Sequence, residues 1–156
     1  MSVLIEHPGT RDALMRQMHR LRILIVDDLA LWRAKTHSLL KPKPNWQVVG
    51  EACNGLQAVQ RTAELSPDLV LLDIGMPILN GIEAAKQIHS AFPSTKIVFL
   101  TQDHDADVRK AALENGADQY VLKANAASEL LPAIENVCGS TAALITPPTQ
   151  PESLPF

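Results

Sequence analysis

The chain has 156 residues, of which 46% are hydrophobic, and this length is enough to bury one substantial hydrophobic core. Its formal net charge of -3 argues against a broad basic surface, so we expect no DNA binding by this chain itself. No apolar run approaches the roughly twenty residues of a membrane span, and the N-terminal residues lack the layout of a signal peptide. Two widely spaced cysteines and five scattered histidines indicate a reducing, cytoplasmic compartment without a zinc site.

Short apolar segments alternate with segments of helical spacing along the middle of the chain. The apolar segments are rich in Ile, Val and Leu, which is typical of strands covered on both faces. They cover residues 22–26, 46–52, 68–72, 96–100 and 120–122. Helical spacing follows each of them, over about residues 29–40, 56–65, 81 onward, 105–115 and 126–137. Because helical crossovers connect parallel strands, the alternation predicts an α/β domain of five strand–helix repeats.

The two ends of the chain differ from this middle part. Residues 1–20 contain no strand pattern and only a weak apolar spacing, so we expect a leader that is partly disordered or a short helix. Residues 139–156 contain four prolines, which favour a flexible tail or an interdomain linker. The sequence therefore predicts one domain over residues 21–138.

Polar residues follow four of the predicted strands at the point where each strand ends. These residues are Asp27 and Asp28, Asp73, Thr101, and Lys123. Each has an ordinary explanation by itself, as a helix cap, a turn residue or a solvated lysine. Parallel strands, however, end at the same edge of a sheet, where open α/β sheets bind ligands. The joint placement therefore predicts one shared site.

The chemistry of such a site is narrow. Neighbouring carboxylates repel one another unless their pKa values rise or a cation lies among them. Oxygen ligands without His or Cys favour a hard cation, for which we expect Mg²⁺. A lysine opposite the acids suits phosphoryl oxygens, and a threonine hydroxyl can donate a further hydrogen bond. Asp73, after the central strand, is the natural nucleophile for an aspartyl phosphate.

On these residues, the chain from about Leu21 to Val137 resembles the receiver domain of two-component response regulators. The matching motifs are Val26-Asp27-Asp28, the run from Leu72 to Gly81, Leu100-Thr101, and Tyr120-Val121-Leu122-Lys123. Gly50-Glu51-Ala52 and Gly116-Ala117-Asp118-Gln119-Tyr120 are most similar to the NarL/FixJ (LuxR-type) branch. The resemblance implies a flavodoxin-like, doubly wound (βα)5 fold with a parallel sheet of order 2-1-3-4-5.

The resemblance also implies a function. Asp73 would accept phosphate from a sensor histidine kinase, so the domain is a signalling phosphoacceptor rather than an enzyme. The implied ligands of Mg²⁺ are Asp28, Asp73, the backbone carbonyl of Gly75 and, through water, Asp27. In this branch a receiver usually precedes a helix-turn-helix DNA-binding domain, which the 156 residues do not include, and DNA binding would belong to that domain.

The resemblance further implies a switch. Thr101 would move toward the phosphoryl group while Tyr120 turns inward, and the surface of the fourth helix, fifth strand and fifth helix would read out the change. A phosphorylation-dependent homodimer is the expected result. Such a response is a two-state element biased by a new dianion and its hydrogen bonds.

Three residues depart from the family pattern. Ala124 follows Lys123 where many receivers have proline, so a cis bond is not expected there. Pro132 removes a backbone donor inside the last predicted helix, which should therefore begin late, near Ser128, or kink. Gln102 replaces a usually small residue, and we expect its side chain to hinder water at the mouth of the site.

Other functions compete with this interpretation. A haloacid-dehalogenase-like phosphatase also uses a strand-end aspartate and Mg²⁺, but it needs a second acid where this chain has Gly75. A flavin-binding domain would need a phosphate loop, and Asp27 and Asp28 would repel the flavin phosphate. A stand-alone receiver, or one that has lost phosphotransfer and acts only through protein contacts, remains an alternative.

Overall fold

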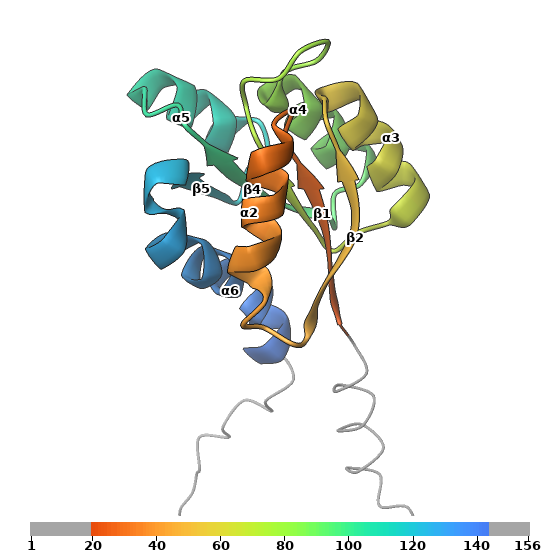
Figure 1. The fold of residues 1–156 in the computed structure, drawn as a ribbon. Coiled ribbons are helices and arrows are strands. Elements are labelled where there is room, and N and C mark those ends of the chain that lie inside the picture. The colour runs from red at the N-terminus through yellow and green to blue at the C-terminus, as the bar shows by residue number, and fades with distance from the viewer. Residues whose placement is uncertain (1–19, 144–156) are drawn as a thin grey trace, which may run out of the picture.

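The predicted strands and helices are present in the computed structural model, which describes residues 20–143. The strands are β1 (Leu21–Val26), β2 (Trp46–Ala52), β3 (Leu69–Leu72), β4 (Lys96–Thr101) and β5 (Gln119–Leu122). The helices are α2 (Ala30–Leu40), α3 (Gly55–Leu65), α4 (Gly81–Ala91), α5 (Ala106–Glu114) and α6 (Ala126–Ala143). All five strands form one parallel sheet in the order β2-β1-β3-β4-β5, which confirms the predicted fold (Figure 1).

Helices cover both faces of the sheet, so the strands are buried on both sides. Ile23 and Ile25 of β1 belong to the core under α2 and α6, whereas Leu24 and Val26 belong to the core under α3, α4 and α5. All four side chains are at most 2% exposed. This double burial explains why the strands read as continuous apolar runs rather than alternating ones.

The register of the sheet brings the predicted site residues to one edge. Val26 pairs with Leu72 and Leu72 with Phe99, while Thr101 at the end of β4 pairs with Leu122 at the end of β5. The residues that directly follow β1, β3 and β5 therefore emerge beside one another and beside Thr101. In Figure 1 this edge lies at the top of the sheet, where β1 continues into α2.

The loop between β3 and α4 is fixed against the start of α3. The Gly55 N–H donates a hydrogen bond to the Leu79 carbonyl at 3.0 Å. A Cβ atom at Gly55 would lie only 2.1 Å from that same oxygen, so the close approach requires glycine. Asn54 caps α3, because its side chain accepts a hydrogen bond from the Gln57 N–H at 2.8 Å. The hydrogen bond from Gly55 to Leu79 therefore holds the loop that follows Asp73 against the start of α3.

The last helix begins where its helical spacing begins and ends later than predicted. A 3-10 turn, η1 (Lys123–Asn125), leads directly into α6 at Ala126, so Pro132 does not delay the start of the helix to Ser128. The exposed Pro132 lies inside the helix, although it removes one helical hydrogen bond. Leu130 and Ile134 on the opposite side are fully buried, and burial of two such side chains contributes roughly 3–6 kcal/mol, which offsets the cost of proline.

The helix also continues to Ala143 and so includes the first five residues of the range predicted as a tail or linker. Gly139 within a helix costs only about 1 kcal/mol relative to alanine and does not end it. The rest of the predicted tail and nearly all of the predicted leader lie outside the described residues. No peptide bond within residues 20–143 is cis, in agreement with the expectation at Ala124.

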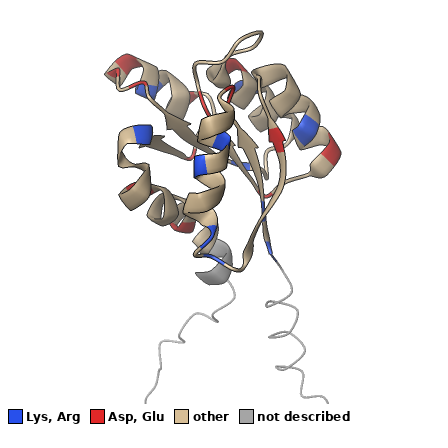
Figure 2. Cartoon of the chain, in the orientation of Figure 1, with Lys and Arg blue, Asp and Glu red and all other residues tan. Residues whose placement is uncertain are grey.

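Two further observations concern the surface. None of the helices within residues 20–143 is long and apolar enough to cross a membrane. Basic and acidic positions are distributed over several helices rather than gathered on one of them (Figure 2). This distribution agrees with the small net charge of the chain.

Candidate functional site

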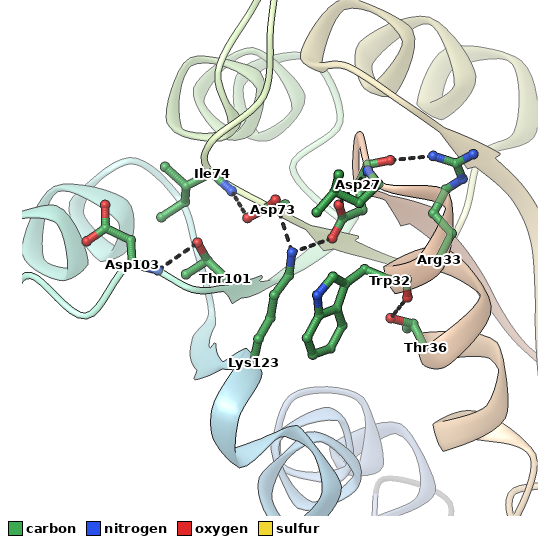
Figure 3. Close-up of polar contacts among 10 residues, drawn as sticks. Asp27, Trp32, Arg33, Thr36, Asp73, Ile74, Thr101, Asp103 and Lys123 are labelled. Atoms are coloured by element: carbon green, nitrogen blue, oxygen red, sulfur yellow. Dashed lines mark hydrogen bonds and ion pairs between the residues drawn. The ribbon is translucent and has the colours of Figure 1, made fainter.

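Three aspartates and one lysine meet at the carboxyl edge of the sheet. Asp27, Asp28 and Asp73 each offer a carboxylate oxygen, and these oxygens lie within 4.8 Å of one another. The ammonium of Lys123 lies 2.8 Å from Asp27 Oδ2 and 3.3 Å from Asp73 Oδ2 (Figure 3). Asp27, Asp73 and Lys123 are at most 7% exposed, whereas Asp28 is exposed. Lysine side chains are usually solvated, but that of Lys123 is buried between two acids.

Backbone hydrogen bonds fix the two buried carboxylates. Asp27 Oδ1 accepts a hydrogen bond from the Leu29 N–H at 2.9 Å, and Asp73 Oδ1 accepts one from the Ile74 N–H at 2.8 Å. In both residues the other oxygen, Oδ2, faces Lys123. The sheet holds the backbones as well, because the Asp73 N–H donates to the Val26 carbonyl at 3.0 Å. Lys123 therefore bridges two rigidly oriented acids.

The charges of the cluster are not balanced. Two buried carboxylates share one ammonium, and Asp28 adds a third negative charge nearby. Burial raises the pKa of Asp27, although the hydrogen bonds from Lys123 and Leu29 act in the opposite direction, and the charge of Asp73 raises the pKa further. Excess negative charge of this kind is relieved by a cation or by protonation.

The site opens to solvent through a pocket of about 470 Å³. Its lining residues are Asp28, Leu29, Asp73, Gly75, Thr101, Gln102, Asp103, His104 and Lys123. Six residues singled out in the sequence therefore line one pocket, including Gly75 and Gln102. Asp27 does not line the pocket and contacts it through Lys123. Tyr120 does not line it either, and the presence of His104 was not anticipated.

Thr101 and Tyr120 both contact Asp103, in the loop after β4. Thr101 Oγ1 accepts a hydrogen bond from the Asp103 N–H at 3.3 Å, and the Tyr120 hydroxyl donates to the Asp103 carbonyl at 2.5 Å. Tyr120 is 7% exposed, and its ring lies 6.2 Å from that of Phe99. Burial raises the pKa of Tyr120 to about 12, and the charge of Asp103 acts in the same direction. The inward side chain of Tyr120 thus anchors the loop that carries Gln102 and His104.

Sequence reasoning missed two residues of α2 that contact the cluster. The Lys123 ammonium lies 4.8 Å from the centre of the Trp32 ring, and an Arg33 guanidinium N–H donates to the Asp27 carbonyl at 2.8 Å (Figure 3). Only their place in the sequence could have indicated these contacts, because the first turn of a helix that follows a strand lies close to the carboxyl edge of the sheet. Nothing in the sequence indicated which face of α2 would turn toward Lys123.

The donor set fits a hard divalent cation. Within residues 20–143, the cluster supplies carboxylate oxygens and neither histidine nor cysteine ligands. Asp28 is exposed on the pocket side, and Gly75 lines the same pocket without any atom within 4 Å of the place where a Cβ would stand. An exposed site with few protein ligands suits Mg²⁺, which retains several water molecules.

A doubly wound sheet that gathers acids, a hydroxyl and a lysine at its carboxyl edge is suited to hold a phosphoryl group on a carboxylate. Comparison with known proteins identifies the family. Residues 23–135 match the response regulator receiver domain, and the chain belongs to that family. The sequence interpretation as a receiver is confirmed, in preference to a phosphatase or a flavin-binding domain.

Individual relatives agree with the expected branch. The chain is 39% identical over 114 residues to the transcriptional regulatory protein LiaR of Bacillus subtilis, covering 73% of this chain and 54% of LiaR. It is 40% identical over 113 residues to the nitrate/nitrite response regulator NarL of Escherichia coli, covering 72% of this chain and 52% of NarL. A LuxR-family response regulator from Aurantimonas has a similar structure, with a TM-score of 0.72, 32% identity and coverage of 75% and 84%. The chain spans about half the length of these curated relatives.

Proposed function

We propose that Asp73 accepts a phosphoryl group from the phosphohistidine of a sensor kinase. A carboxylate oxygen of Asp73 attacks the phosphorus, and the P–N bond to the donor imidazole breaks as the new O–P bond forms. The observation that carries the proposal is the environment of Asp73: a buried, backbone-fixed carboxylate lies 3.3 Å from the Lys123 ammonium and lines an open pocket. Lys123 provides the positive charge that phosphoryl oxygens need.

Mg²⁺ belongs to this proposal as a cofactor. Asp28, Asp73 and the backbone carbonyl of Gly75 would hold it, with Asp27 contributing through water. The cation supplies charge neutralisation where two anions, the carboxylate and the phosphoryl donor, must approach each other. The excess negative charge of the aspartate cluster supports this assignment.

The proposed switch uses Thr101 and Tyr120. Thr101 lines the pocket, and its hydroxyl can donate to a phosphoryl oxygen on Asp73. Its movement would pull on the loop at Asp103, whose carbonyl accepts the Tyr120 hydrogen bond. Tyr120 packs against Phe99 and under Arg109 of α5, so a shift of the loop reaches the surface formed by α5, β5 and α6.

The relatives also support a proposal for the biological role. We propose that the chain is the receiver of a LuxR-type transcriptional regulator in the cytoplasm, with a sensor kinase as its donor and a phosphorylation-dependent homodimer as its output. The alternative is a stand-alone receiver that acts through protein contacts. In either role it is a phosphoacceptor rather than an enzyme with a separate substrate. Light scattering with and without beryllofluoride should detect the dimer, and a monomer under both conditions would contradict it.

Intact-mass measurement tests the central step. Incubation with Mg²⁺ and a small phosphodonor such as acetyl phosphate should add one phosphoryl group to the parent and none to Asp73→Asn. Asp107→Asn is the matched control, because the same change is made at an exposed position on α5. Equal phosphorylation of Asp73→Asn and the parent would reject Asp73 as the acceptor.

A further inference from the structure

The ring of Trp32 forms one wall of the Lys123 binding site. The Lys123 ammonium lies 4.8 Å from the ring centre, within the range of a cation–π interaction. Its other neighbours are Asp27 at 2.8 Å and Asp73 at 3.3 Å, and its side chain is only 3% exposed. Figure 3 shows the indole alongside the lysine side chain, on the side of α2. A buried ammonium is thus held by two carboxylates and an aromatic face.

Hydrogen bonds connect the position of this ring to Asp27. The backbone N–H of Trp32 donates to the Leu29 carbonyl at 3.0 Å, and the backbone N–H of Leu29 donates to Asp27 Oδ1 at 2.9 Å. Arg33, the next residue, donates to the Asp27 carbonyl at 2.8 Å. The first turn of α2 is therefore bonded to both the carboxylate and the main-chain carbonyl of Asp27, which places Trp32 at the Asp27 end of the cluster.

Trp32 differs in this respect from Trp46. Trp46 packs against the hydrophobic core under α2 and α6, whereas Trp32 is not among the described side chains packed into either core cluster. The cations that lie near the half-buried Trp32 ring are Lys123 and, at 4.6 Å, Lys35. Lys35 is exposed to water, which weakens its interaction, whereas Lys123 is buried. Lys123 is thus the buried one of the two cations that lie over this ring.

We propose that Trp32 is a positioning residue that holds the Lys123 ammonium on Asp27 and Asp73 and thereby opposes the binding of a divalent cation to the same carboxylates. The inference rests on the proposed function, because Mg²⁺ and the ammonium would compete for Asp73 and for the negative potential of the cluster. Without the aromatic face, the Lys123 ammonium is bound less firmly at the two carboxylates, so Mg²⁺ binds to the cluster more tightly. Trp32 would in this way set the Mg²⁺ concentration at which the site becomes ready for phosphoryl transfer.

Isothermal calorimetry with magnesium chloride and metal-depleted protein tests this, and it does not depend on tryptophan fluorescence. Trp32→Leu should tighten Mg²⁺ binding by about 2- to 5-fold, the factor that corresponds to a cation–π interaction of ordinary strength. Trp32→Phe keeps an aromatic face and should stay closer to the parent. Trp46→Leu is the matched control, because Trp46 also has a lysine, Lys43, over its ring but lies at the start of β2. It should leave Mg²⁺ affinity unchanged.

The same Trp32 substitution, made in a protein that already carries Lys123→Met, separates a positioning role of Trp32 from a general structural effect. In Lys123→Met the ammonium is absent, so Trp32→Leu should no longer change Mg²⁺ affinity. An equal change in both backgrounds, or no change in either, would overturn the inference while leaving Asp73 and Mg²⁺ in their proposed roles. The proposed metal site is tested separately, because Asp28→Asn should weaken binding in every background. Failure of the parent to bind Mg²⁺ would reject the metal site and this inference together.

Discussion

Lys123 lies closer to Asp27 than to Asp73, with N–O distances of 2.8 Å and 3.3 Å. The lysine is therefore paired most closely with the carboxylate that is not the proposed nucleophile. Each carboxylate also accepts one backbone hydrogen bond, from Leu29 to Asp27 and from Ile74 to Asp73, so the two acids differ in the length of the contact to the ammonium. This asymmetry leaves Asp73 the less firmly engaged of the two acids and determines how variants of the cluster should behave.

Mg²⁺ affinity should respond in opposite directions to loss of an acid and loss of the lysine. Asp28→Ala removes a proposed ligand and should weaken binding by about tenfold or more, or roughly 1.4 kcal/mol. Lys123→Ala leaves the acids unopposed and should preserve or strengthen binding while impairing the switch. Trp32 lies near Lys123 and should report binding by a change in fluorescence, which a Mg²⁺ titration can follow. Unchanged affinity in Asp28→Ala would place the metal elsewhere.

The raised pKa of Asp27 predicts a particular pH dependence of stability. Burial raises this pKa above 3.8, so the folded protein binds a proton at Asp27 more readily than the unfolded chain does. The contribution of Asp27 to the free energy of unfolding is thus fully present below pH 3.8 and is lost as the pH rises through the pKa of Asp27 in the folded protein. Urea unfolding in EDTA should show the parent losing stability relative to Asp27→Asn over that range. A difference that stays constant with pH would contradict the raised pKa.

Tyr120 is the chain's single tyrosine, so its titration can be followed by ultraviolet absorbance without interference. The folded protein should titrate near pH 12, compared with 10 for an unperturbed tyrosine. Since the folded state keeps the proton, stability from this group is complete below pH 10 and is lost as the pH approaches 12. Tyr120→Phe removes the hydrogen bond to Asp103 and should cost about 0.5–1.5 kcal/mol at neutral pH. A midpoint near 10 in the folded protein would mean that the hydroxyl is exposed.

The lifetime of the aspartyl phosphate should depend on Gln102. Its exposed side chain lines the mouth of the pocket, where bulk hinders an attacking water molecule. An amide could instead orient that water, but productive orientation requires a narrow geometry that a flexible glutamine seldom holds. Gln102→Ala should therefore lose phosphate faster than the parent after donor removal, as measured by intact mass. Gln60→Ala, exposed on α3, is the control, and slower decay in Gln102→Ala would assign the amide the opposite role.

Replacement of Pro132 should stabilise the protein. Pro132 is exposed inside α6, where a proline costs about 3 kcal/mol relative to alanine in an unconstrained helix. Pro132→Ala restores the missing N–H and should raise the free energy of unfolding by about 1–3 kcal/mol, as urea denaturation can measure. Ile134→Ala in the same helix should lower it by about 2–5 kcal/mol, because Ile134 is fully buried. No gain from Pro132→Ala would indicate that the helix already accommodates the proline by a local bend.

The sequence predicted the sheet and the convergence of the site because both depend on local patterns. Apolar strands with a polar residue at each carboxyl end place Asp73 and Lys123 together once the sheet is parallel. The partners of those residues depend instead on how helices rotate about their axes and pack on the sheet. The contact of Trp32 with Lys123 and the burial of that ammonium therefore needed the structure. The helix α6 passes Pro132 without a late start because buried Leu130 and Ile134 outweigh the local effect of that proline.

The proposed nucleophile and its lysine are 50 residues apart in the chain, and Asp27 and Thr101 come from two further strands. Each of these strands lies in a different part of the sequence, and β5 is the last to be synthesised. An incomplete chain that ends before β5 has the acids but not the ammonium between them. If Asp73 is the acceptor, as proposed, competence to accept a phosphoryl group requires the whole sheet to have assembled, and we expect a partly made or locally unfolded molecule not to be phosphorylated.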